Sequence, residues 1–138
     1  MTTFTAKSKW IGIDEGSRKV IEVSPAMQLR KEFNYIKKGN VTCVICGLGT
    51  YILYVNGKRV SDEYFLPLNS DYEPRNAHPM GEVLAHRTYV DSFEIAPFLK
   101  KGKNTVAVLL GEGWYTFPEY SRNKPFGERK LIYRVFDK

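Results

Sequence analysis

Two loop-like segments carry the side chains best suited to binding a small molecule. Trp114 and Tyr115 follow the run Gly-Glu-Gly in the later segment, and Asp71 and Tyr72 lie in the earlier one. Aromatic rings of this kind stack on the apolar face of a sugar or line a cleft. If both segments leave the fold at one end, the four residues form a single candidate substrate-binding site. The alternative is that Trp114 and Tyr115 only plug one end of the core.

A run of oxygen-bearing side chains in the earlier segment raises the question of a metal. Asn69, Asp71 and Glu73 alternate there, and hard cations such as calcium take oxygen ligands. The run is not an EF-hand loop, because the sixth position from Asn69 is not glycine. Polar residues that form a turn are the other interpretation. We therefore expect no cofactor, with calcium at these three residues as the alternative.

Nothing in the sequence marks a catalytic centre. Hydrolysis of a glycosidic bond needs two facing carboxyl groups about 5 to 10 Å apart, and the neighbours Asp62 and Glu63 would point to opposite faces of a strand. His78 and His86 have neither a helical partner nor a nucleophile beside them, which indicates loop or surface residues. The run that begins at Gly111 leads into no helix, so it is not a phosphate-binding loop. We expect no catalytic residue in this chain.

Short strands are the elements that must position these residues. Apolar runs alternate with Gly, Pro, Asn and Asp, which is the pattern of strands and turns. Strands are predicted at residues 27–33, 41–46, 51–55, 58–60, about 86–95, 105–110 and 131–136. Residues 96–102 predict one helical turn, with Pro97 at its first position, lysines at its C-terminal end and Gly102 as its stop.

The pair Asn56-Gly57 is the clearest local signal in the chain. A type I′ turn needs positive φ at both central residues, and Asn-Gly supplies it. A two-residue loop of this type would pair Val55 with Lys58 and Leu53 with Val60.

The succession of short strands without a long helix predicts an all-β fold. We expect an antiparallel, jelly-roll-like β-sandwich, with a barrel of the OB type as the alternative. Residues 41–46 and 105–110 lack a polar face. They are therefore predicted to be central strands whose outer face is covered by a loop or by another domain.

The charge pattern argues against nucleic acid as a partner. The net charge is +6, but the basic residues are scattered in doublets such as Arg129-Lys130, which predict solvated turns and not one basic patch. No apolar run reaches the roughly 18 residues of a membrane span. The first twelve residues lack the pattern of a signal peptide, which favours a cytoplasmic location.

The two cysteines form a Cys-x-x-Cys pair in residues 41–46. On a strand Cys43 and Cys46 point to opposite faces, too far apart for a disulfide. A zinc site would need two further ligands, and no second pair exists. We predict buried, reduced thiols, which favours a reducing compartment.

Five segments in order resemble the N-terminal β-sandwich domain of bacterial α-L-rhamnosidases. They are WIGID (10–14), LRKEF (29–33), Gly47–Pro67, Ser70-Asp71-Tyr72 and Leu99–Tyr115. The resemblance implies a single domain over residues 1–138 and a downstream (α/α)-barrel that holds the catalytic acids and hydrolyses terminal α-L-rhamnosyl groups. In the family the strand that corresponds to LIYRVFDK normally continues into an Asp-Gly turn and further strands. The resemblance therefore implies a C-terminally truncated piece of a longer enzyme, with an edge strand open to pairing.

Three functions follow from these features. The first is a non-catalytic accessory domain that helps to recognise a rhamnose-containing carbohydrate or packs on the catalytic barrel; the methyl group of a 6-deoxy sugar suits an aromatic wall. The second is an autonomous carbohydrate-binding module, with calcium as an option. The third is a purely structural interaction domain.

Overall fold

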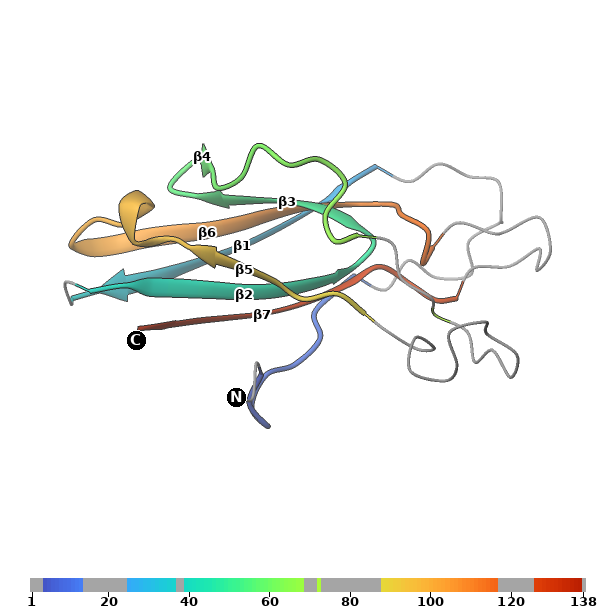
Figure 1. Cartoon of the computed structure of the whole chain (residues 1–138), viewed down its shortest axis with the longest axis horizontal. Coiled ribbons are helices and arrows are strands. Elements are labelled where there is room, and N and C mark those ends of the chain that lie inside the picture. The colour runs from blue at the N-terminus through green and yellow to red at the C-terminus, as the bar shows by residue number, and fades with distance from the viewer. Residues whose placement is uncertain are drawn as a thin grey trace.

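Two antiparallel sheets pack face to face in the computed structural model, which describes residues 4–13, 25–36, 39–68, 72, 88–116 and 126–137 (Figure 1). One sheet has the order β1-β6-β3-β4 and the other β5-β2-β7. The strands are β1 (Met27–Tyr35), β2 (Val41–Leu48), β3 (Thr50–Val55), β4 (Lys58–Arg59), β5 (Asp91–Glu94), β6 (Gly102–Gly111) and β7 (Lys130–Asp137). The predicted β-sandwich is confirmed, and the barrel alternative is wrong because the sheets remain separate.

The core lies between the sheets and is built by strict alternation. In β6, Val106, Val108 and Leu110 are buried while the residues between them are only half-buried. Their partners in β3 are Val55, Leu53 and Tyr51, which point the same way. The facing sheet contributes buried side chains from β2 and β7, namely Val41, Cys43, Ile45 and Leu131.

The predicted hairpin is confirmed residue by residue. Asn56 has φ of 51° and Gly57 φ of 78°, so both central residues are left-handed as a type I′ turn requires. Val55 pairs with Lys58, and the Val60 amide donates to the Leu53 carbonyl at 3.0 Å. This is the one connection between successive described strands that stays within a sheet.

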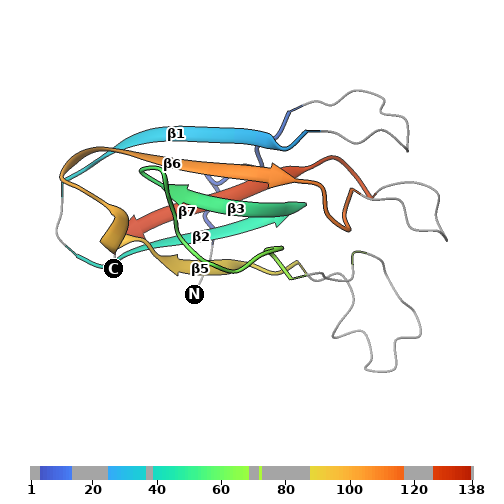
Figure 2. The ribbon, with the colours of Figure 1, turned by 90° about the horizontal axis from the view of Figure 1, so that it is seen from above.

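A single residue carries the chain from one sheet to the other between β2 and β3. Gly49 has φ of +134°, and a Cβ placed on it would lie 2.6 Å from the Gly111 carbonyl oxygen. Only glycine accommodates both the backbone conformation and the close approach. The sharp corner leaves the end of β2 and the start of β3 at the same end of the sandwich (Figures 1 and 2).

The two strands without a polar face have different surroundings. Both faces of β2 are buried within this chain, including the outward-facing Thr42, Val44 and Cys46. No additional domain is needed to cover β2. The outer face of β6 is only half-buried within this chain, so cover of that face by another domain stays a prediction.

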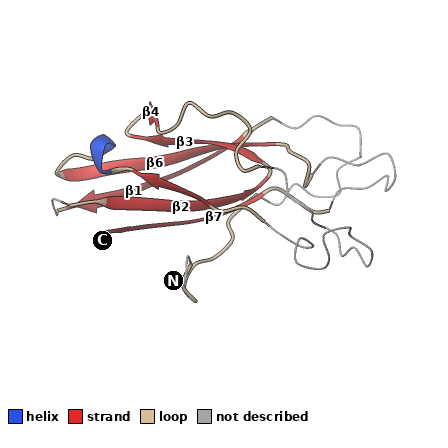
Figure 3. Cartoon of the chain, in the orientation of Figure 1, coloured by secondary structure: helices blue, strands red, loops and turns tan. Residues whose placement is uncertain are grey.

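Several predicted boundaries differ from the structure (Figure 3). The strand expected near 86–95 is β5, Asp91–Glu94, although residues 86 and 87 lie outside the described residues. The helical turn is the 3₁₀ helix η2 (Ala96–Phe98), which ends before the lysines. Gly102, with φ of +91°, begins β6 and does not end the helix. Strand β6 is longer than predicted because it pairs with the whole of β1.

One basic doublet is not a solvated turn. Arg129 is 1% exposed, and its Nη1 donates to the carbonyl oxygens of Pro25 at 2.9 Å and Leu110 at 3.4 Å. Its neighbour Lys130 is exposed, so β7 alternation separates the two cations. The buried guanidinium joins the chain before β1, the end of β6 and the start of β7.

Both cysteines are buried and unpaired, as predicted. Cys43 lies in the core and Cys46 on the opposite face of β2. Burial raises the pKa of Cys43 to about 12. Burial and the nearby Asp91 carboxylate raise that of Cys46 to about 11. Within the described ranges, the chain has no helix long and apolar enough to cross a membrane.

Candidate functional site

The candidate residues that the structure describes, Tyr72, Trp114 and Tyr115, gather at the end of the sandwich where β2 and β6 finish and β3 and β7 begin. The register fixes this arrangement, because Leu48 pairs with Lys130 and Thr50 pairs with Gly111. In Figures 1 and 2 these strand ends lie together at the right. We call this part of the molecule the loop end.

A tight turn over residues 113–116 presents the two predicted aromatic residues. The Thr116 amide donates to the Gly113 carbonyl at 3.0 Å, which leaves Trp114 and Tyr115 at the two central positions. A Cβ on Gly113 would lie 3.0 Å from the Thr50 amide nitrogen, so glycine allows the turn to rest on the start of β3. The Thr50 hydroxyl donates to the Glu112 carbonyl and fixes the preceding residue.

Tyr115 lies in a cluster of three aromatic rings, which we call the aromatic cluster. The ring of Tyr72 contacts the ring of Tyr115 edge-on, with centroids 5.0 Å apart. It contacts the ring of Phe126 in the same way, with centroids 5.2 Å apart. Tyr115 and Phe126 stack at 5.9 Å, and the Phe126 amide donates to the Tyr115 carbonyl at 3.0 Å. Such pairs are worth about 0.5–1.5 kcal/mol each beyond the buried area. The cluster joins three chain segments at the loop end.

The two predicted loops therefore meet, but their aromatic residues divide into two environments. Tyr72 and Tyr115 are half-buried in the aromatic cluster. Trp114 is 60% exposed and does not plug the core. The remaining candidates Asn69, Asp71 and Glu73, like His78 and His86, lie outside the described residues. Among the residues described, no group of three or more His, Cys, Asp or Glu side chains could hold a metal ion.

Phe126 is the member of the site that sequence reasoning missed. The available signal was the following Gly127, because a Cβ there would lie 2.9 Å from the Tyr115 hydroxyl oxygen. A glycine directly after an aromatic loop residue can indicate a close approach of another ring.

A second exposed aromatic side chain lies beside the start of β3. The Tyr51 amide donates to the Leu66 carbonyl at 2.7 Å, which fixes the segment after β4 against this strand. Phe65 has φ of 60° and is 79% exposed, and Leu68 is exposed as well. A non-glycine residue at positive φ costs roughly 1–2 kcal/mol. The structure thus holds an apolar side chain in water in an unfavourable conformation.

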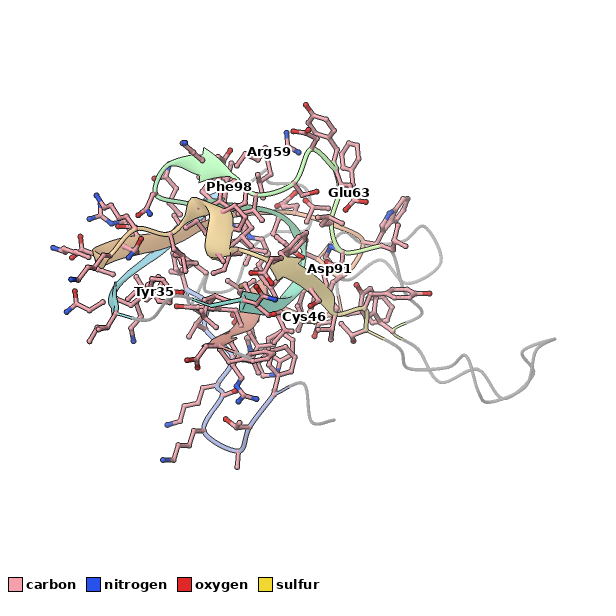
Figure 4. The ribbon with its side chains drawn as sticks, turned by 60° about the vertical axis from the view of Figure 1, so that its left-hand side comes forward. Tyr35, Cys46, Arg59, Glu63, Asp91 and Phe98 are labelled. Atoms are coloured by element: carbon pink, nitrogen blue, oxygen red, sulfur yellow. The ribbon has the colours of Figure 1, made fainter. Side chains whose placement is uncertain are left out.

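One ionisable pair connects the two sheets near the loop end. The Tyr51 hydroxyl on β3 donates to the Asp91 carboxylate on β5. Burial raises the pKa of Asp91, the hydrogen bond from Tyr51 lowers it, and the negative charge of Glu63 raises it again. Figure 4 shows Asp91 in the space between Glu63 and Cys46. Because Asp91 is engaged by Tyr51 between the sheets, we assign it a structural role.

The family model and the curated relative that match this chain point to the same family. A family model described as the α-L-rhamnosidase N-terminal domain matches residues 37–135. An α-L-rhamnosidase of Formosa agariphila is 29% identical over 109 residues, which are 78% of this chain and 10% of that protein.

Solved structures of three α-L-rhamnosidases are also similar. The Aspergillus terreus enzyme has a TM-score of 0.73 at 24% identity. The Dictyoglumus thermophilum enzyme has a TM-score of 0.68 at 27% identity. Each of these two matches covers 94% of this chain and 14% of the other chain. The Streptomyces avermitilis enzyme, solved with L-rhamnose, has a TM-score of 0.61 at 22% identity over 82% of this chain and 10% of the other. This chain thus spans only a tenth to a seventh of the relatives it matches.

Proposed function

The chain belongs to the α-L-rhamnosidase N-terminal domain family, and on that premise we propose that it is a non-catalytic accessory domain of a larger α-L-rhamnosidase. In this proposal residues 1–138 belong to one jelly-roll-like domain of a bacterial enzyme. The loop end assists recognition of a rhamnose-containing carbohydrate, and a downstream (α/α)-barrel of the same protein carries out the hydrolysis.

The exposed indole of Trp114 is the observation that carries this proposal. Its turn is held against β3, and its neighbour Tyr115 is fixed in the aromatic cluster. A rigidly presented aromatic face loses little entropy when a ligand binds. Rhamnose has a methyl group where mannose has a hydroxymethyl group, so an aromatic wall gains apolar contact from it.

Tryptophan fluorescence tests the proposal directly, because the chain has only two tryptophans. The Trp10→Phe variant leaves Trp114 as the sole reporter. Titration with L-rhamnose should give a saturable change, and L-mannose, which adds a hydroxyl in place of a hydrogen on that methyl carbon, should bind more weakly. The heat measured by calorimetry should be smaller in Trp114→Ala.

The same titration separates the alternatives. A signal that appears only with calcium, and is lost with a chelator, favours an autonomous calcium-dependent module and directs attention to Asn69, Asp71 and Glu73. A flat signal together with no heat contradicts sugar binding by the isolated chain and leaves the packing role.

Packing on a neighbouring domain is the second candidate function, and Phe65 favours it. Its exposed ring and positive φ are unfavourable in isolation, and contact with an apolar partner surface would offset that cost. Phe65→Asn, which tolerates positive φ, should not destabilise the isolated chain. It should weaken the association of this chain with the separately produced catalytic domain, measured by calorimetry. Unchanged association would contradict a role for Phe65 in packing.

A further inference from the structure

A short N-terminal segment lies along the start of β7 and is fixed there by backbone contacts. The Ile11 amide donates to the Leu131 carbonyl and the Leu131 amide to the Ile11 carbonyl, both at 2.8 Å. A Cβ on Gly12 would lie 2.7 Å from the Arg129 carbonyl oxygen, so only glycine permits this approach. Figure 1 shows this segment rising to β7 from the N-terminus.

Alternation places the neighbouring side chains on one surface. Arg129 and Leu131 point into the core and are fully buried. Glu128 and Lys130 therefore point outward. The Lys130 Nζ and the Glu128 Oε2 are 3.9 Å apart, and both side chains remain nearly half exposed. This distance is too long for a direct hydrogen bond between the two groups, so both keep the capacity to hydrogen-bond a ligand.

These residues border an open cavity on the surface, of about 470 Å³, lined by Trp10, Gly12, Ile13, Glu128 and Lys130. Trp10, which is 45% exposed, and the exposed Ile13 contribute apolar side chains to this lining, and Glu128 and Lys130 contribute a charged pair. Its size lies within the range of about 300–1,000 Å³ typical of small-molecule sites.

The chemistry of the walls restricts the ligand. A carboxylate and an ammonium group balance each other, so the cavity disfavours a ligand with net charge of either sign. It suits a neutral molecule with adjacent hydroxyl groups, one donating to Glu128 and one accepting from Lys130. The indole favours a molecule with an apolar face. A pyranose ring combines these properties.

We propose that the cavity between Trp10, Glu128 and Lys130 binds a neutral pyranose unit and is a carbohydrate site additional to the one at Trp114. None of its lining residues belongs to the aromatic cluster or to the turn that carries Trp114. Its test is therefore independent of the proposed function.

The Trp114→Phe variant isolates this cavity, because it leaves Trp10 as the only tryptophan. We expect a saturable fluorescence change on titration with at least one of L-rhamnose, D-galactose and D-glucose, and protection of Trp10 from acrylamide quenching. D-glucuronate and D-glucosamine, which carry opposite charges, should bind more weakly than the neutral sugar that binds best.

Substitutions of the charged pair decide whether the cavity is responsible. In the same background, Glu128→Gln and Lys130→Met should each weaken binding by about tenfold or more, because each removes a charged hydrogen-bond partner. Glu32→Gln and Lys103→Met are matched controls, since they break an exposed ion pair of 2.6 Å on the other sheet. They should leave binding unchanged.

Two results would overturn the proposal. One is the absence of both a fluorescence change and heat with all three neutral sugars. The other is binding that is equally strong in Glu128→Gln and Lys130→Met. Circular dichroism confirms that the variants fold, as expected for partly exposed side chains. The titration of Trp10→Phe reports on Trp114 alone, so either site can fail without the other.

Discussion

Asn104 is almost completely buried, yet both polar atoms of its side chain are satisfied twice. Its Nδ2 donates to the carbonyl oxygens of Lys100 at 2.7 Å and Gly102 at 2.8 Å. Its Oδ1 accepts from the Lys100 amide at 2.9 Å and from Asn56 Nδ2 at 2.8 Å. Asn56 therefore forms the hairpin turn and also ties it to β6 through Asn104 and to the preceding 3₁₀ helix through the Phe98 carbonyl.

Replacing Asn104 by Ala should destabilise the fold by about 1–3 kcal/mol, because backbone groups of Lys100 and the Asn56 amide lose a partner in a part-buried setting. Urea unfolding followed by circular dichroism measures the change. Asn34→Ala is the matched control, since Asn34 is exposed on β1. An equal effect of the two substitutions would contradict the role assigned to this network.

Asp91 should make stability depend on pH. Burial is the main cause of its raised pKa, so the folded state binds this proton more tightly than the unfolded state does. The stabilising contribution is fully present below the unfolded pKa of about 3.9 and is lost as pH rises through the folded pKa.

The comparison with Asp91→Asn tests this sign. The asparagine oxygen can still accept from Tyr51, but it carries no titrating proton. We expect the unfolding free energy of the wild type, relative to the variant, to be greatest near pH 4 and to decrease as the pH is raised toward neutral. A difference that is constant across this range would show that Asp91 does not titrate differently on folding.

The cysteines should be chemically silent in the native protein. Only a thiolate is nucleophilic, and the pKa values of Cys43 and Cys46 are raised to about 12 and about 11. At pH 8 a disulfide reagent such as Ellman's should label neither thiol in the folded chain and both in guanidinium chloride. Rapid labelling of the folded chain would mean that β2 opens readily.

At the scale of elements, the corner between β2 and β3 restricts the residue type most strongly, because it requires glycine at position 49. Gly49→Ala should destabilise the protein by more than about 2 kcal/mol, because the new Cβ meets both a left-handed backbone and the Gly111 carbonyl. Gly39→Ala is the control, since a Cβ at Gly39 meets nothing within 4 Å. Thermal unfolding distinguishes them, and similar melting temperatures would contradict the constraint at the corner.

The strand pattern was predictable where alternation and turn chemistry agree, as in Tyr51–Val60. It failed where partner strands decide the length, because pairing with β1 begins β6 at Gly102 and pairing with Thr50 of β3 extends it to Gly111. The same limit explains Arg129. With β7 predicted to begin at Leu131, alternation was not extended back to Arg129, and nothing local indicates that Pro25 and Leu110 provide its acceptors.

At the scale of the whole molecule, the candidate site depends on the two-sheet arrangement. The expectation that two loops meet followed from a sandwich with loops at its ends, and Tyr72 does contact Tyr115. Phe126 was missed because the connection between β6 and β7 has no regular pattern that gives its position, and Gly127 was the one local signal. The cavity at Trp10 was also missed, since it depends on the pairing of Ile11 with Leu131, residues far apart in the sequence.

Apart from the hairpin between β3 and β4, every step between successive described strands crosses from one sheet to the other. Each of the remaining strand pairs therefore joins segments that are distant along the chain, such as β1 with β6 and β2 with β7. Closing such large loops costs entropy before the contacts form. The chain should accordingly fold slowly, in milliseconds to seconds. Among the described strands, the pair joined by the Asn56-Gly57 turn is the only one that can form early from local contacts.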